Sequence, residues 1–246
     1  VLLQIAIQIT DCLNQVHQQQ VIHKDVNPAN VVWNSQTGQL KLIDFGIATR
    51  LTRETPTPHP PPCLEGTLAY MSPEQTGRMN RDVDYRTDLY SLGVTLYELL
   101  TGRLPFLTSD ALALVHAHIA QLPTPPHDLV PEIPPSLSAV VMTLMAKNAE
   151  DRYQSASGLM ADLEECRQQW QTAGTIRAFP LRQQDVADHL QIPQTLYGRE
   201  RDSRTLLAAF TRVCQGANEL MLVSGQAGVG KSVLVRELYK SLTQQR

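Results

Sequence analysis

The stretch "HKDVNPANVVWNSQTGQLKLIDFG", residues 23–46, indicates how this chain folds. It begins with a polar loop, and two short runs of apolar and β-branched residues follow at 31–33 and 40–43. Gly38, in the connection between the two runs, tolerates the backbone angles of a tight turn. The stretch therefore predicts a β-hairpin that follows the polar loop and ends at Asp44.

Helical patterns lie on both sides of this hairpin. Apolar residues recur at three- and four-residue steps from Leu2 to Val16, which predicts an amphipathic helix, and a short strand-like run follows at 21–22. Residues 88–102 are nearly all apolar and predict a buried helix that Gly102 ends. Further helices are expected near 109–121, 136–147 and 155–170, and a mobile, proline-rich surface loop is expected at 47–71.

Three side chains of the opening stretch have the chemistry that phosphoryl transfer requires. One carboxylate must take the proton of the attacking hydroxyl, while another carboxylate and an amide hold Mg²⁺ on the phosphates of ATP. Asp25 is the candidate proton acceptor, Asn30 is a candidate magnesium ligand, and Asp44 is the candidate ligand for both magnesium and nucleotide. In order and spacing these residues resemble the catalytic loop and Asp-Phe-Gly segment of the eukaryotic-type Ser/Thr protein kinases.

The resemblance extends along much of the chain. "TLAYMSPE", 67–74, is similar to the family's substrate-docking loop, with serine in place of alanine before Pro-Glu. The resemblance implies a catalytic-site position for Thr67, an ion pair between Glu74 and Arg152, and a buried Asp88 that holds the backbone of the catalytic loop. It also assigns structural positions to His23, Phe45 and Gly46, and it implies ATP and Mg²⁺ as cofactors.

Two catalytic-loop positions depart from the family's pattern. Lys24, a catalytic-site candidate, replaces the arginine of His-Arg-Asp, which keeps the positive charge but loses the planar guanidinium. Asn27 replaces the lysine that contacts the transferred phosphate, and the loss of such a cation costs on the order of 10- to 1000-fold in rate unless another group compensates. The 22 residues before His23 contain no lysine or glutamate, so the kinase N-terminal lobe is expected to be missing and this piece alone to be inactive.

A second phosphate-binding pattern lies near the end of the chain. "GQAGVGKS", 225–232, fits the P-loop pattern, whose glycines let backbone N–H groups surround phosphates at a helix N-terminus. Lys231 is expected to reach the β- and γ-phosphates and Ser232 to bind a second Mg²⁺. A helix near 203–214 and a strand at 219–223 are expected before the loop, and "LYGRERDSRTLLAAF" resembles the entry helix of AAA-type ATPases. The nucleotide-binding candidates are Gly225, Gly228, Gly230, Lys231 and Ser232.

Composition excludes several classes of protein. The formal net charge of −3 argues against a nucleic-acid partner, and no apolar run is long enough to span a bilayer. The four cysteines show no CxxC spacing, which fits reduced thiols and a cytoplasmic location. His116 and His118 stand two apart on an expected helix, so they cannot share a metal ion and are expected on the surface.

The expected architecture is a mainly α, α+β kinase C-terminal lobe at 1–170, a linker at 171–195, and the start of an α/β P-loop ATPase domain at 196–246. Both ends fall inside expected helices, so the chain is expected to be a piece of a longer protein. The combination resembles large cyanobacterial signalling proteins in which a Ser/Thr kinase and an AAA-like ATPase are joined to GAF and histidine kinase modules.

Three hypotheses of function follow. The first is transfer of the γ-phosphoryl group of ATP to Ser or Thr of a protein substrate by the intact parent protein. The second is a pseudokinase scaffold that regulates the adjoining ATPase or a downstream histidine kinase. The third is that nucleotide binding by the second domain, through Lys231, switches signalling by the protein on and off.

Overall fold

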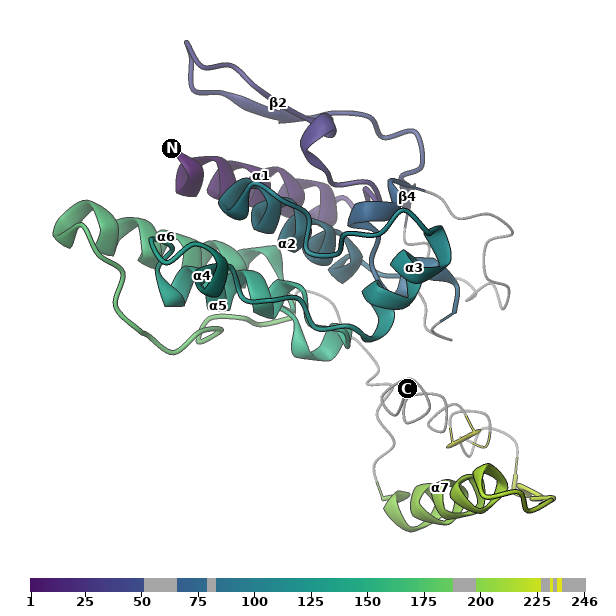
Figure 1. Cartoon of the computed structure of the whole chain (residues 1–246). Helices are drawn as coiled ribbons and strands as arrows, with labels where there is room; N and C mark the ends of the chain where they lie inside the picture. The colour runs from purple at the N-terminus through teal and green to yellow at the C-terminus, as the bar shows by residue number, and fades with distance from the viewer. Residues whose placement is uncertain (51–65, 79–82, 188–197, 227–230, 232–233, 236–246) are drawn as a thin grey trace. The chain divides into compact units, whose positions relative to one another are not determined.

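A computed structural model describes residues 1–50, 66–78, 83–187, 198–226, 231 and 234–235. The chain divides into two units, Val1–Asp188 and His189–Arg246. The first unit is mainly helical, and its helices are drawn in purple to green in Figure 1. The expected domain boundaries at 170 and 196 stay a prediction.

The centre of the first unit is α2, Arg86–Thr101, which is buried at every position from Arg86 to Tyr97. This is the helix that the apolar run predicted, and it ends at Gly102 in the left-handed conformation, with φ of 71°. Helix α5, Pro135–Leu144, packs closely on it, because a Cβ at Gly93 would lie 2.7 Å from Leu144 Cβ. A glycine inside α2 therefore sets the distance between the two helices.

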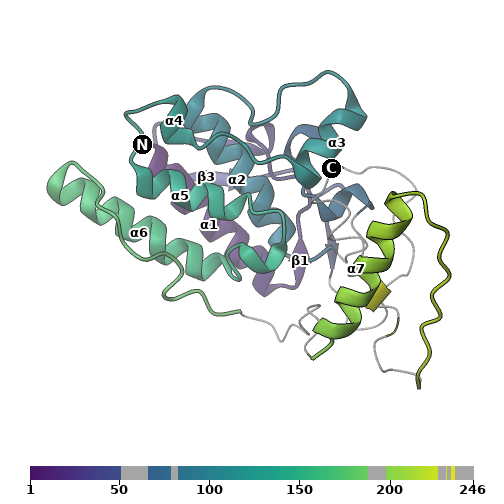
Figure 2. The same cartoon turned by 60° about the horizontal axis from the view of Figure 1, so that its bottom comes forward.

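Helix α1, Leu2–Gln18, confirms the predicted amphipathic helix and buries the face that carries Ala6, Ile9 and Leu13. It packs mainly against α6, Ala156–Ala173, as Figure 2 shows, and it also contacts α2. The described residues of this unit also form α3 (Ala111–Ala120), α4 (Pro126–Leu129) and the short 3₁₀ helices η1 (Pro28–Asn30), η2 (Leu68–Tyr70), η3 (Glu74–Thr76) and η4 (Ala149–Asp151).

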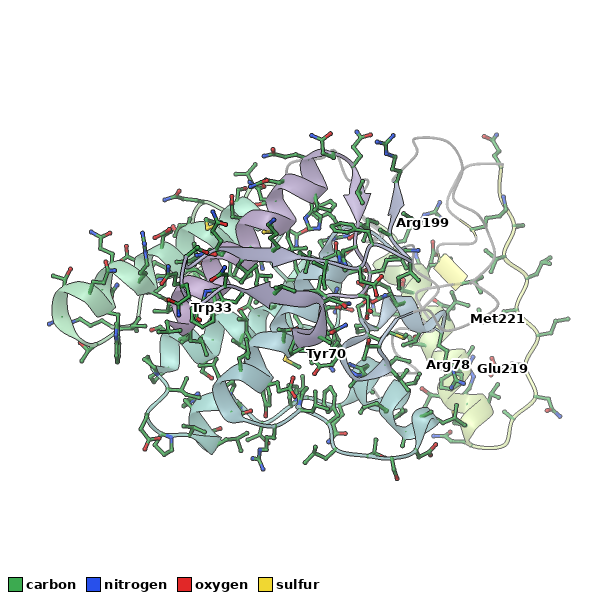
Figure 3. The ribbon with its side chains drawn as sticks, turned by 90° about the horizontal axis from the view of Figure 1, so that it is seen from above. Trp33, Tyr70, Arg78, Arg199, Glu219 and Met221 are labelled. Atoms are coloured by element: carbon green, nitrogen blue, oxygen red, sulfur yellow. The ribbon has the colours of Figure 1, made fainter. Side chains whose placement is uncertain are left out.

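The hairpin in the opening stretch of sequence is confirmed. Strands β2, Val31–Trp33, and β3, Leu40–Leu42, pair antiparallel with Val31 opposite Leu42, and Gly38 in the turn has a φ of 69°. The hairpin extends from the helices at the top of Figure 1. Trp33 lies on it with 40% of its surface exposed (Figure 3).

A second pair of strands joins a segment that was predicted to be a strand to one that was predicted to be an irregular loop. Strand β1, Val21–Ile22, was expected, and it pairs antiparallel with β4, Thr49–Arg50. Strand β4 falls inside the stretch expected to be an irregular loop, and its two residues are too few to show an alternating pattern. Residues 51–65 of that expected loop lie outside the described residues, and near its end residues 68–70 form the 3₁₀ helix η2.

Residues 174–187 continue along the first unit after α6, although the sequence indicated a linker from 171 to 195. Helix α6 runs to Ala173, Ile176 is buried in the core, and Phe179 and Leu181 pack against it. Residues 188–195 lie outside the described residues. The stretch is rich in glutamine and has no hydrophobic periodicity, so its sequence does not show that single apolar residues pack it against the core of the first unit.

The second unit contains α7, Glu200–Cys214, where a helix was expected. The strand expected at 219–223 is absent, because the described residues 217–226 carry no regular structure and Leu220 and Leu222 are 99% and 92% exposed. A strand requires a hydrogen-bonded neighbour, and none of the described residues of this unit pairs with this run. The apolar composition of this run was therefore not sufficient to predict a strand.

Two further findings concern membrane-spanning helices and the cysteines. Among the described residues, no helix has the length and hydropathy that a membrane crossing demands. Cys12, Cys166 and Cys214 are free thiols, and Cys63 lies outside the described part of the chain.

Candidate functional site

The loop at 23–30 is folded by its own side chains. Asn27 caps η1 by accepting a hydrogen bond from the Ala29 N–H at 2.9 Å, and Pro28 occupies the first position of that helix. This turn brings Asn30 back to Asp25, where its Nδ2 donates to the Asp25 carbonyl at 2.8 Å and to the carboxylate Oδ2 at 3.0 Å. Two of the predicted site residues are thus in direct contact.

Asp88, at the start of α2, binds the backbone of this loop through hydrogen bonds. Its buried carboxylate accepts hydrogen bonds from the N–H groups of His23 and Lys24, at 2.9 and 2.8 Å, and from His17 Nε2 at 2.8 Å. Lys24 has a positive φ of 69°, an uncommon conformation for a residue other than glycine. The two backbone bonds to Asp88 hold the chain in this turn, and no local sequence pattern indicates the contribution of His17.

His23 joins the loop to the segment that carries Asp44. Its ring is buried, Nδ1 accepts from the Asp25 N–H at 3.3 Å, and Nε2 lies 3.0 Å from the Ile43 carbonyl. Since a carbonyl oxygen can only accept, Nε2 is the donor in the second contact. The His23 ring also packs edge-on against Phe45, with centroids 4.6 Å apart.

Asp44 itself is exposed and has a positive φ of 62°. Its Oδ1 accepts a hydrogen bond from the Gly46 N–H at 3.2 Å, which sets the direction of the side chain. Aspartate tolerates the left-handed region better than most residues, and such backbone conformations gather at functional sites.

The segment at 66–78 closes on the same loop. The Thr67 N–H donates to Asp25 Oδ1 at 2.8 Å, and Asn27 Nδ2 donates to Thr67 Oγ1 and to the Asp25 carbonyl, both at 3.2 Å. Gln75 Nε2 adds a bond to the Lys24 carbonyl at 2.8 Å. Both oxygens of the Asp25 carboxylate are therefore held, one by Asn30 and one by Thr67.

Glu74 and Arg152 form a buried ion pair, as the resemblance implied. The guanidinium contacts the carboxylate at two points, 2.7 and 2.9 Å, and it also donates to the Ala146, Lys147 and Arg86 carbonyls. Burial raises the pKa of Glu74, but the charge and hydrogen bonds of Arg152 outweigh burial and lower this pKa to about 2. Thr87 Oγ1 donates a further bond to Glu74 at 2.8 Å. The pair ties 66–78 to the helical core.

A buried polar cluster lies beside this ion pair. His118 Nδ1 is 3.0 Å from the Tyr90 hydroxyl, and Lys147 Nζ donates to the Ala117 carbonyl at 3.2 Å and lies 4.7 Å from the centre of the Phe106 ring. Burial and the Arg152 charge lower the pKa of Lys147 to about 7, while burial and Lys147 lower the pKa of His118 to about 4.

The surface position expected for His118 is wrong, because its ring is fully buried against Tyr90 and Phe106. His116, on the other side of α3, is exposed. Helix α3 is apolar nearly all round, so the sequence did not show which of its faces is covered. No group of three or more His, Cys, Asp and Glu residues in the described part of the chain is placed to hold a metal ion.

Asn30 and Asp44 have the donor chemistry that a magnesium ion requires. The Asn30 nitrogen is committed to Asp25, so its amide oxygen is the atom that remains for a cation, and the Asp44 carboxylate is exposed beside Gly46. Mg²⁺ prefers oxygen ligands and is commonly bound by one or two protein side chains together with substrate phosphates. The residues present therefore fit this ion.

The second candidate site is described only in part. Lys231 Nζ donates to the Gly225 and Gln226 carbonyls, at 2.8 and 2.7 Å, so this side chain folds over the start of the loop. Gly228, Gly230 and Ser232 lie outside the described residues. Their predicted contacts with nucleotide stay predictions.

Comparison with known families gives two matches. Residues 2–163 match the model of the protein kinase domain, and residues 195–246 match that of an AAA ATPase domain.

Several curated proteins are similar to this chain. Hybrid signal transduction histidine kinase G of Dictyostelium discoideum is 40% identical over 194 residues, 71% of this chain and 6% of that protein. A probable serine/threonine-protein kinase of Corynebacterium efficiens is 40% identical over 164 residues, 65% of this chain and 24% of that protein. Serine/threonine-protein kinase PknB of Mycolicibacterium smegmatis is 41% identical over 151 residues, 61% of this chain and 24% of that protein. The chain thus spans a minor part of each relative.

Proposed function

This chain belongs to the protein kinase family, and from that membership we propose that it supplies the catalytic loop and the substrate-docking segment of an ATP-dependent protein serine/threonine kinase. The docking segment is residues 66–78. The observation that carries the proposal is the fixed carboxylate of Asp25, with Asn30 on one oxygen and the Thr67 N–H on the other. The two relatives described above whose names are a probable serine/threonine-protein kinase and a serine/threonine-protein kinase, at 40% and 41% identity, support it.

Asp25 is the proposed acceptor for the proton of the substrate Ser or Thr hydroxyl. The two hydrogen bonds to its carboxylate orient the acceptor oxygens, and they tie its position to that of the docking segment, where the substrate chain would lie. Lys24 carries the backbone turn that presents Asp25, and Asp88 holds that turn.

Asn30 and Asp44 are the proposed magnesium ligands. When bound, Mg²⁺ neutralises charge on the phosphates of ATP during transfer of the γ-phosphoryl group. The contribution of this chain is to orient the two oxygen ligands, Asn30 through Asp25 and Asp44 through the Gly46 N–H. His23 joins the two ligand-bearing segments and thereby fixes their separation.

Phosphorylation of a peptide by the full-length protein tests this function. Asp25→Ala should lower kcat by at least about 1000-fold, because proton acceptance and the tie to Thr67 are both lost. Asp128→Ala, an exposed carboxylate of the same unit, is the control and should retain full activity. Equal phosphate incorporation by the wild-type and Asp25→Ala proteins would rule out the proposed role of Asp25.

The chain spans 6–24% of the relatives described above, so the surrounding protein is part of the proposal. We infer a cytoplasmic, multidomain signalling protein in which the kinase is followed by a second ATP-binding domain with its P-loop at Gly225–Ser232. The AAA ATPase match and the hybrid histidine kinase relative support linked modules of this kind. The protein substrate would present Ser or Thr to Asp25.

One observation favours the scaffold hypothesis as a second candidate. Asn27 is 3% exposed and places no cation beside Asp25, where the family's lysine stands. A regulatory domain that does not transfer phosphate would tolerate this change. If the full-length protein phosphorylates a peptide and Asp25→Ala abolishes this activity, the domain is an enzyme. If the intact full-length protein shows no phosphorylation, the scaffold hypothesis is correct.

A further inference from the structure

Residues 174–187 form what we call the return segment, which lies beyond the match to the protein kinase domain. The chain turns back after α6 and runs along the helices of the first unit (Figure 1). The Ser136 hydroxyl donates to the Arg177 carbonyl at 3.0 Å, and the Arg177 N–H donates to Gln169 Oε1 at 2.8 Å. Together with buried Ile176, these bonds make the return segment an integral part of the unit.

Asp185 binds the C-terminal end of the return segment to the loop that precedes α6. Its side chain is 1% exposed, and its carboxylate accepts from the Gln154 N–H at 2.8 Å, the Ser155 N–H at 3.0 Å and Arg182 Nε at 3.0 Å. The Ser155 hydroxyl adds a bond at 3.2 Å. Gln154 and Ser155 precede the first turn of α6, where a negative charge also interacts favourably with the helix dipole.

Gly158, in the first turn of α6, leaves the space that Asp185 occupies. A Cβ at this position would lie 2.5 Å from Asp185 Oδ1 and 2.6 Å from Asp185 Cα. Glycine is less favourable than alanine inside a helix, so the close approach of the return segment accounts for its presence here.

The loop at 152–155 is thereby held from two sides. On one side Arg152 contacts Glu74 of the docking segment, and on the other side Asp185 holds the backbone of Gln154 and Ser155. The Gln154 side chain also accepts from Arg86 Nη1 at 2.9 Å. A loop fixed at both flanks leaves its arginine little freedom to shift.

We propose that Asp185 is a positioning residue for the docking segment: it fixes residues 154–155, hence Arg152, hence Glu74. The effect on catalysis rests on the proposed kinase function, while the structural coupling does not.

Amide hydrogen exchange on the 246-residue chain tests the coupling directly. In Asp185→Ala, exchange should become roughly tenfold faster at Gln154 and Ser155, whose acceptor is lost. It should also rise at Gln75, Thr76 and Gly77, whose N–H groups are bonded within the docking segment. Glu132→Ala, at an exposed carboxylate of the same unit, is the matched control and should change neither set.

Gly158→Ala separates the coupling from a general loss of stability. Alanine favours helix α6, yet its methyl group displaces Asp185, so the same two sets of amides should exchange faster without a fall in the stability of the helix. Unchanged exchange at Gln75, Thr76 and Gly77 in both variants would overturn the proposal.

A kinetic measurement on the full-length protein addresses the catalytic consequence. Asp185→Ala should raise KM for a peptide substrate roughly tenfold and leave KM for ATP unchanged, because the docking segment is the proposed binding surface for the peptide and not for the nucleotide. An equal rise in both values would overturn the positioning role. If the wild-type protein phosphorylates nothing while the exchange results hold, the proposed kinase function fails and the structural coupling stands.

Discussion

Asn27 has both N–H groups of its amide engaged, one with the Asp25 carbonyl and one with Thr67 Oγ1. Its oxygen caps η1 through the Ala29 N–H. The residue that departs from the family's lysine is therefore a connection between the catalytic loop and the docking segment. A group this committed orients its neighbours and is not available to contact a phosphate.

Substitution of Asn27 separates its capping bond from its bond to Thr67. Asn27→Ala removes the cap and the bonds to Asp25 and Thr67, and should lower the free energy of unfolding by about 1–2 kcal/mol in urea titrations. Asn27→Ser keeps a capping oxygen but cannot reach Thr67, so it should recover most of the stability while kcat stays reduced. Full activity of Asn27→Ser would show that the bond to Thr67 is dispensable.

Lys147 makes the stability of the first unit depend on pH. Its pKa is lowered to about 7 by burial and by Arg152, whereas an unfolded lysine titrates near about 10.4. Between about pH 7 and 8 the unfolded chain binds more protons than the folded one, so stability should rise with pH by roughly 1 kcal/mol per unit.

From about pH 8 upward Cys166 contributes a slope of the opposite sign, because burial raises its pKa to about 12 and its unfolded thiol, with a pKa of about 8.5, ionises first. The rise due to Lys147 is therefore to be measured from about pH 7 to 8, by urea unfolding at each pH. Lys147→Met should remove the slope, and a slope that persists in this variant would assign it to another group.

At the scale of elements, the Glu74–Arg152 pair connects η3 to the loop that precedes α6. Arg152→Met should cost about 3–5 kcal/mol of unfolding free energy, because it leaves the Glu74 carboxylate buried and unpaired. The double variant Glu74→Met/Arg152→Met should cost less than the single one, since no lone charge remains. Arg167→Ala, in an exposed pair with Glu164, is the control and should cost under about 0.5 kcal/mol.

The elements that the sequence predicted are those with a repeating pattern. α1 and α2 and the β2–β3 hairpin follow from helical periodicity, from a continuous apolar run and from two short strands around Gly38. Two-residue β4 and the return segment have no repeat, so their positions depend on contacts with distant residues. The expected strand at 219–223 shows the opposite case, in which an apolar run pairs with no strand among the residues that the structure describes.

The candidate site was predictable as a set of residues but not as a network. The positions of Asp25, Asn30, Asp44, Glu74 and Arg152 follow from motif order. The bonds through His17, Gln75 and the side chain of Asn27 join segments tens of residues apart, and nothing local marks these residues as partners. The burial of His118 likewise depends on what α3 packs against.

At the scale of the whole molecule, the two units are expected to bind nucleotide separately. Lys231→Ala should lower ATP affinity of the second unit at least about tenfold, because a phosphate-binding cation is lost, while peptide phosphorylation by the first unit survives. Calorimetry of nucleotide binding and a peptide assay on the full-length protein measure the two properties. Arg212→Ala, on the same unit, is the control, and loss of phosphorylation in Lys231→Ala would show that the kinase depends on the second site.

The contact between Gly158 and Asp185 has an evolutionary consequence. A side chain at 158 and a carboxylate at 185 cannot occupy the same space, so mutations at the two positions constrain each other's acceptance. A relative whose kinase domain ended without a return segment would be free to replace the glycine with a better helix former. A relative that keeps the acidic residue at the position of Asp185 must also keep a glycine at the position of Gly158. The two residues should therefore be inherited or lost together.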